Sequence, residues 1–201
     1  MKPRILFSFL MVLNFAVSPN HAAYAAGNPG TGQQRLKDCA RCHGPSATAA
    51  SQEPIPKLGG QHAEYFLSAL EGYVSGDRTH AGMKGIAAAL TNQDKEDIAA
   101  YLARFELTKF SIPSLGESTP LEGKLEVCRS CHGERGKNFT PDTPQLIGQD
   151  ERYLFKSLKS YQNGDRKNAS MVYVVRNLTE RDLAEMASYY ASQKEGLTPI
   201  E

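Results

Sequence analysis

Two short segments of this chain carry residues whose types and spacing suit covalent attachment of a haem. Residues 39–43 (CARCH) and 128–132 (CRSCH) both read C-x-x-C-H, the attachment signature for a c-type haem. Two thiols three residues apart on a helix meet the two vinyl groups of one porphyrin, and the histidine that follows can reach the iron. The attachment residues are Cys39, Cys42, Cys128 and Cys131, which are all the cysteines of the chain. The sequence therefore predicts two haem c groups, with His43 and His132 as proximal iron ligands.

The second axial ligand of each iron is expected to be a methionine. Met83 and Met171 occupy equivalent places in the two halves of the chain, where we expect loops that carry a thioether to the far face of each haem. Met186 falls inside a predicted helix and is expected in the core, as most lone methionines are. A thioether ligand raises the reduction potential relative to two histidines. His/Met ligation at both irons therefore favours electron transfer.

Two other histidines compete for the first iron. His62 aligns with Asp150 and His80 with Asn168, and neither counterpart is a plausible haem ligand in the second half. The second half has no histidine besides His132, so two-histidine ligation within that half is excluded. We therefore favour the methionines at both irons.

Paired disulfides are the alternative use of four cysteines in an exported protein. They would leave both adjacent histidines unexplained, so haem attachment is favoured. Thioether formation needs an oxidising, extracytoplasmic compartment, and the N-terminus predicts export. Lys2 and Arg4 precede an apolar run of residues 5–17, and small residues with an Ala23-x-Ala25 site follow, which is typical of a cleaved signal peptide over residues 1–26. The run is short of the roughly 20 residues that span a bilayer, so an uncleaved anchor is the lesser alternative.

Charge and hydropathy exclude two classes of partner. The formal net charge is +1, and removal of residues 1–26 takes away two basic and no acidic side chains, so no basic stripe indicates nucleic-acid binding. No later segment is apolar enough to cross a membrane, although weak association with a membrane surface is left open. The expected location is the periplasm, and the expected partners are redox proteins.

The elements that position these ligands come from a tandem duplication. From Pro56 onward the two halves align at a constant offset of 88 residues, and at the haem motifs the offset is 89. A unit of this length is too long for a solenoid repeat and suits a small domain. We expect domains over residues 27–110 and 121–201, joined by a linker over residues 111–120 that contains two prolines.

The periodicity predicts an all-α fold with no convincing strand pairs. Helices are expected from about residue 31 into Cys42, from about residue 121 into Cys131, and from about Gln61 to Gly76, with a copy that ends at Gly164. The last helix of each half should begin with a capping box, in residues 91–94 and 179–182.

Residues around the irons are expected to support the ligands. The backbone carbonyls of Pro56 and Pro144 are candidates to accept the second N–H of each proximal imidazole. Arg78 and Arg166 follow a helix-ending glycine in both halves. They are expected either to pair with haem propionates or to remain solvated on a turn.

Taken together, these features resemble the di-haem cytochrome c4 family over the whole chain beyond residue 26. The resemblance rests on the paired C-x-x-C-H motifs and on two repeated segments, PKLGGQ and PQLIGQ (56–61, 144–149) and YVSGDR and YQNGDR (73–78, 161–166). It implies two class I cytochrome c domains related by a pseudo-twofold axis. It also implies electron transfer in the bacterial periplasm, between a quinol-oxidising complex or dehydrogenase and a terminal oxidase.

Two other functions remain open from the sequence. The chain could be the dedicated cytochrome subunit of a periplasmic dehydrogenase, which a large exposed apolar patch would favour. A di-haem enzyme such as a peroxidase needs an open iron site. Since both halves have a methionine in place, an enzyme ranks lowest.

Overall fold

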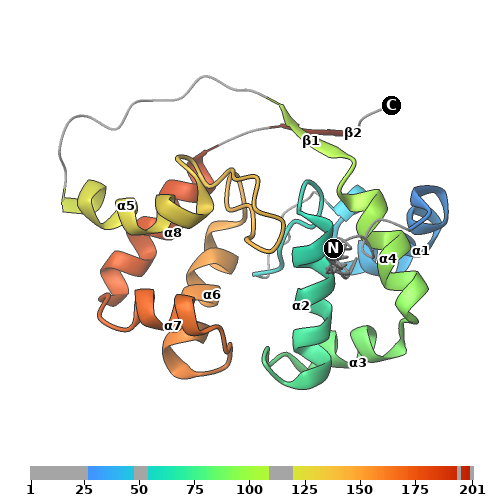
Figure 1. Cartoon of the computed structure of the whole chain (residues 1–201), viewed down its shortest axis with the longest axis horizontal. Coiled ribbons are helices and arrows are strands. Elements are labelled where there is room, and N and C mark those ends of the chain that lie inside the picture. The colour runs from blue at the N-terminus through green and yellow to red at the C-terminus, as the bar shows by residue number, and fades with distance from the viewer. Residues whose placement is uncertain (1–26, 48–53, 109–119, 194–195, 200–201) are drawn as a thin grey trace, which may run out of the picture.

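The computed structural model describes residues 27–47, 54–108, 120–193 and 196–199, which fold into two helical units side by side (Figure 1). We call residues 27–108 the N-terminal unit and residues 120–193 the C-terminal unit. The helical prediction is confirmed, and the tandem arrangement is visible in the order of the helices. The predicted signal peptide lies outside the described residues, as does the predicted linker except Pro120, which is the first residue of a helix.

The N-terminal unit is built from α1 (Pro29–His43), the short 3-10 helix η1 (Pro45–Ala47), α2 (Ala63–Ser75), α3 (Ala81–Ala89) and α4 (Asn92–Leu102). Helix α2 ends at Gly76, whose φ of 87° lies in the left-handed region that glycine adopts without strain. Helix α4 begins with the predicted capping box of Thr91 and Asp94. The helix ends are therefore those that the sequence predicts.

The C-terminal unit repeats this order with α5 (Pro120–His132), α6 (Glu151–Asn163), α7 (Ala169–Val175) and α8 (Glu180–Ser192). Gly164 ends α6 with a φ of 85°, and Thr179 and Asp182 form the capping box of α8. Equivalent sequence signals thus give equivalent helices in both units.

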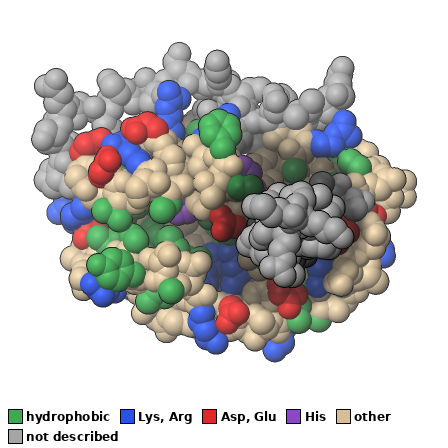
Figure 2. Space-filling view, viewed as in Figure 1, with side chains coloured by type: hydrophobic (Ala, Val, Ile, Leu, Met, Phe, Trp, Pro, Cys, Tyr) green, Lys and Arg blue, Asp and Glu red, His purple; other side chains and the backbone are tan. Residues whose placement is uncertain are grey.

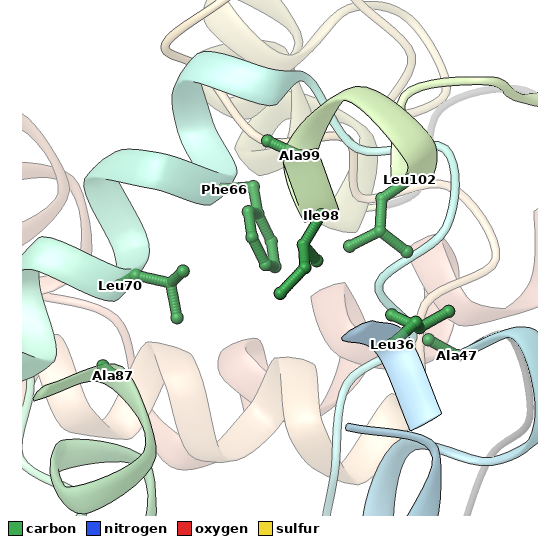
Figure 3. Packing of buried hydrophobic residues seen from close by; sticks show 8 residues of the cluster. All are labelled: Leu36, Ala47, Phe66, Leu70, Ala87, Ile98, Ala99 and Leu102. Atoms are coloured by element: carbon green, nitrogen blue, oxygen red, sulfur yellow. The ribbon is translucent and has the colours of Figure 1, made fainter. Parts of the chain in front are cut away.

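Each unit has its own apolar core. In the N-terminal unit the core joins α1, α2, α3 and α4, and Figure 3 shows Phe66 beside Ile98, with Leu102 pointing toward Leu36 and Ala47. In the C-terminal unit Leu125 is fully buried beside Leu154, Met186 and Tyr190. Met186 is therefore a core residue, as predicted. The two cores hold the helices that carry the cysteines against the last helix of each unit.

The two units face each other with α2 and α6 on their inner sides (Figure 1). The turns that follow these two helices make reciprocal backbone contacts. The Thr79 N–H donates to the Asp165 carbonyl at 2.8 Å, and the equivalent Lys167 N–H donates to the Asp77 carbonyl at 2.8 Å. Between them, Arg78 and Arg166 form an antiparallel bridge. Equivalent residues thus meet each other, as the predicted pseudo-twofold axis requires.

The expectation of no strand pairs was wrong at one place. Strand β1 (Phe105–Thr108) follows α4 and pairs antiparallel with β2 (Gly196–Pro199), which follows α8; Phe105 lies opposite Pro199 and Thr108 opposite Gly196. Four-residue strands are too short to show alternation, and their partner lies far away in the sequence. The pair joins the end of the chain to the N-terminal unit.

Candidate haem-iron sites

Both C-x-x-C-H motifs form the last turn of a helix. α1 ends at His43 and α5 ends at His132, so the two cysteines of each motif lie one turn apart. In each motif the first cysteine is half-buried and the second is exposed, and all four thiols are free. The disulfide alternative is therefore not what the structure shows.

The proximal imidazoles are oriented by the carbonyls that were predicted to hold them. His43 Nδ1 lies 2.7 Å from the Pro56 oxygen, and His132 Nδ1 lies 3.0 Å from the Pro144 oxygen. Nδ1 carries the proton in this arrangement, which leaves the Nε2 lone pair for a metal. Burial lowers the pKa of both imidazoles and favours the neutral form that binds iron.

Met83 and Met171 lie in equivalent first turns of short helices, not in the loops that we predicted. Met83 is the third residue of α3, and its N–H donates to His80 Nδ1 at 3.1 Å. Met171 is the third residue of α7, and its N–H donates to Asn168 Oδ1 at 3.0 Å. The segments were missed because each helix is short. Both side chains are half-buried, and their role as iron ligands stays a prediction.

The competing histidines are both engaged elsewhere. His80 caps α3, as Asn168 caps α7, which explains why these two residue types align. His62 Nε2 lies 2.9 Å from Gln145 Nε2 and 3.2 Å from the Asn138 carbonyl, so it contacts the other unit.

Arg78 and Arg166 are not solvated on a turn, which was one of the two alternatives predicted for them. Arg78 Nη2 donates to the Tyr65 hydroxyl at 2.6 Å, and Arg166 Nη2 donates to the Tyr153 hydroxyl at 3.1 Å. Each guanidinium also lies over two tyrosine rings of its own unit. The second rings belong to Tyr73 and Tyr161. The two cations are thus fixed at the centre of the interface, and their pairing with haem propionates stays a prediction.

The residues present fit a haem c in each unit. Two free thiols one turn apart suit two thioether bonds, and an imidazole with Nδ1 already hydrogen-bonded suits an iron ligand. Cys39, Cys42 and His43 would hold one group, and Cys128, Cys131 and His132 the other. A haem iron supplies one-electron oxidation and reduction. The chain's own residues fix the imidazole and would hold the porphyrin beside the core of each unit.

Two interface glutamines were missed by sequence reasoning. Gln61 hydrogen-bonds the backbone of Gln145 in the other unit, and Gln149 hydrogen-bonds the backbone of Lys57. The signal was available, since both glutamines close the repeated P-x-L-x-G-Q segment. The repetition of this segment indicates a shared role, and that role is contact with the opposite unit.

Comparison with known proteins agrees with this geometry. Residues 30–105 match the cytochrome c family model. The chain is 31% identical over 199 residues to a cytochrome c4 of Pseudomonas aeruginosa, covering 92% of this chain and 96% of that protein. The chain belongs to the cytochrome c4 family. Reduced recombinant cytochrome c4 from Pseudomonas stutzeri superimposes with a TM-score of 0.67 at 28% identity, covering 84% of this chain and all of that one. A thiosulfate dehydrogenase electron acceptor of Stutzerimonas stutzeri is 30% identical, over 78% of this chain and 80% of that protein.

As a cytochrome c4, the chain is a di-haem electron carrier with two covalent haem c groups and not an enzyme. Within the described residues, no helix is both long and apolar enough to cross a membrane.

Proposed function

We propose that this cytochrome c4 is a periplasmic carrier that takes electrons from a quinol-oxidising complex or a dehydrogenase and delivers them to a terminal oxidase. The ligands are His43 and Met83 at one iron and His132 and Met171 at the other. The proposed boundaries are a signal peptide over residues 1–26, domains over 27–110 and 121–201, and a linker over 111–120.

The repetition of the whole site carries this proposal. In each unit a cysteine pair, a histidine held through Nδ1 and a methionine in the first turn of a short helix occur in the same order. A methionine on the sixth position of each iron would leave no site for oxygen or peroxide, and would raise both potentials into the range of a late electron carrier.

Rapid-mixing absorbance measurements test the proposal. The reduced protein is mixed with a membrane preparation that contains a terminal oxidase, and the oxidised protein with a preparation that contains a quinol-oxidising complex. We expect both irons to be oxidised in the first experiment and reduced in the second. Failure of both reactions, with both irons intact, would contradict the carrier function.

A second candidate is the dedicated electron acceptor of one dehydrogenase. Two observations favour it: the similarity to a thiosulfate dehydrogenase electron acceptor, and apolar side chains on the surface of the C-terminal unit. Figure 2 shows hydrophobic side chains gathered over this unit. Val172 and Tyr173 on α7 are exposed by 39% and 64%, whereas the equivalent residues of α3 are Lys84 and Gly85.

A substitution on this apolar surface tests the second candidate. Val172→Lys should slow reduction by such a dehydrogenase several-fold and leave oxidase turnover unchanged. Equal effects on both partners would contradict this candidate.

A further inference from the structure

The peptide group that holds each proximal histidine is also bonded to the opposite unit. Pro56 and Lys57 share one peptide group, whose carbonyl oxygen lies 2.7 Å from His43 Nδ1. The N–H of the same group, on Lys57, donates to Gln149 Oε1 in the C-terminal unit at 2.8 Å. Gln149 Nε2 donates back to the Lys57 carbonyl at 2.9 Å, so both ends of the amide are engaged.

The reverse contact has the same form. Pro144 and Gln145 share the peptide group whose carbonyl oxygen lies 3.0 Å from His132 Nδ1. Its N–H, on Gln145, donates to Gln61 Oε1 in the N-terminal unit at 3.0 Å, and Gln61 Nε2 donates to the Gln145 carbonyl at 2.6 Å. Each unit therefore reaches the histidine support of the other with one glutamine.

Hydrogen bonds through one peptide group strengthen each other. Resonance links the N–H and the carbonyl, so an acceptor on the N–H makes the carbonyl oxygen a better acceptor. A stronger acceptor on Nδ1 raises the basicity of the imidazole, and a more basic ligand stabilises the oxidised metal. Gln149 is buried, so little water is at hand to replace its bonds.

We propose that Gln61 and Gln149 are positioning residues that set the reduction potential of the iron in the opposite unit. Gln149 acts through the Pro56–Lys57 peptide on His43, and Gln61 acts through the Pro144–Gln145 peptide on His132. This inference rests on the proposed electron-carrier function, and it makes the interface a part of both redox sites.

The two peptide groups that hold the histidines differ in how many hydrogen bonds they have within their own unit. Asn138 Nδ2 also lies 3.3 Å from the Pro144 oxygen, and Gln145 Nε2 donates to the Asn138 carbonyl at 2.9 Å, so the C-terminal support has bonds within its own unit. Loss of Gln149 is therefore expected to have the larger effect.

The test is a redox titration of the holoprotein carrying Gln61→Met or Gln149→Met, substitutions that keep the side-chain volume and remove both hydrogen bonds to the opposite unit. Gln149→Met also removes the bond that Oε1 accepts from the Asp150 N–H in its own unit. The titration is followed by NMR, in which the signals of each haem are assigned by nuclear Overhauser contacts to its own cysteine pair. Gln149→Met should raise the potential of the iron bound by His43, and Gln61→Met that of the iron bound by His132. A threefold or larger change in the ratio of reduced to oxidised iron, about 28 mV for one electron, is expected for Gln149→Met.

Gln162→Met is the matched control. Gln162 lies in the same unit as Gln149 and likewise bonds the backbone through its amide, but it donates to the carbonyls of Val175 and Leu178, which lie within its own unit. This variant should leave the potential of the iron bound by His43 unchanged. If a methionine variant does not fold, Gln61→Asn and Gln149→Asn replace it, because the shorter amide cannot span the same two backbone groups.

A shift confined to the iron of the mutated unit, or no shift in either iron, would overturn the inference. Failure of the proposed function is a separate result, because it would appear in the unmutated protein as a loss of electron exchange with both membrane preparations.

Discussion

Asp150 caps its own helix α6 in the C-terminal unit, whereas the equivalent His62 leaves α2 uncapped in the N-terminal unit. Asp150 Oδ1 accepts from the Tyr153 N–H at 2.9 Å. The equivalent N–H, on Tyr65, instead donates at 3.1 Å to the carbonyl of Pro141, which belongs to the C-terminal unit. The start of α2 in the N-terminal unit is thus capped by a carbonyl of the C-terminal unit. Duplication preserved the C-x-x-C-H motif in both units, while the start of α2 came to depend on the interface.

A second difference lies at the turn after each C-x-x-C-H motif. Ala47 and Gly136 are equivalent, and both adopt a positive φ, 53° and 81°. A Cβ added to Gly136 would lie 2.8 Å from Leu146 and from Tyr190. Ala47 is tolerated because the residue equivalent to Tyr190 is the smaller Leu102. At this turn the C-terminal unit therefore has a glycine beside a tyrosine ring, and the N-terminal unit has an alanine and the smaller leucine.

Removal of the proposed methionine ligands should have the largest effects, and it tests whether the irons of the two units have the same ligands. Met83→Ala and Met171→Ala should each lower the potential of one iron, on the order of a few tenths of a volt, and open that iron to carbon monoxide. Redox titration and absorbance spectra with carbon monoxide measure both effects. Met186→Ala is the control, since this buried core residue should cost about 2–5 kcal/mol of stability and leave both potentials unchanged. A spectrum unaltered in Met171→Ala would contradict the ligand assignment.

The turn difference predicts unequal responses to a single methyl group. Gly136→Ala should lower the free energy of unfolding by about 1–3 kcal/mol, because the new Cβ meets Leu146 and Tyr190. The reverse change, Ala47→Gly, should be close to neutral, since relief of the left-handed conformation offsets the lost methyl contact. Denaturant unfolding of both variants measures the difference. Equal losses would show that the Tyr190 ring is not the cause.

The capping difference predicts a smaller contrast. Asp150→Ala should cost about 1 kcal/mol, because the Tyr153 N–H loses its acceptor. His62→Ala should lower the free energy of unfolding by less, because the hydrogen bond from the Tyr65 N–H to the Pro141 carbonyl still caps α2. Thermal unfolding monitored by circular dichroism compares them. A larger loss in His62→Ala would mean that its contacts with Asn138 and Gln145 matter more than the cap.

Two equivalent ion pairs predict a shared response to acid. Lys124 pairs with Asp182 between α5 and α8, and Arg35 pairs with Asp94 between α1 and α4 at 2.7 Å. Hydrogen bonds from Lys124 and Thr179 hold the pKa of Asp182 at about 2, and bonds from Thr91 and Arg35 lower that of Asp94. Both pKa values lie below the unfolded value, so this stability is complete above about pH 4 and is lost as the pH falls toward 2.

Unfolding measured between pH 5 and pH 2 tests this response. The unmutated protein should lose stability steeply, and Asp182→Asn should show a flatter decline from a lower starting value. The same slope in both proteins would contradict the assigned cause.

Much of this architecture follows from local sequence signals. The attachment motifs, Gly76 and Gly164, and the two capping boxes predict helix ends because each acts within one turn. The carbonyls of Pro56 and Pro144 were also predictable, since a proximal histidine needs an acceptor near in sequence. The pairs of Gln61 with Gln145 and of Tyr65 with Pro141 were not, because they join residues more than 70 positions apart. The helices that carry Met83 and Met171 were missed because short helices have too little periodicity.

A redox titration of the unmutated holoprotein tests the central claim most directly. If both units are complete His/Met sites, two one-electron oxidations should appear, both in the high-potential range of methionine-ligated haems, with two haems per chain. A titration that accounts for one electron per chain, or one wave at strongly negative potential, would contradict this claim.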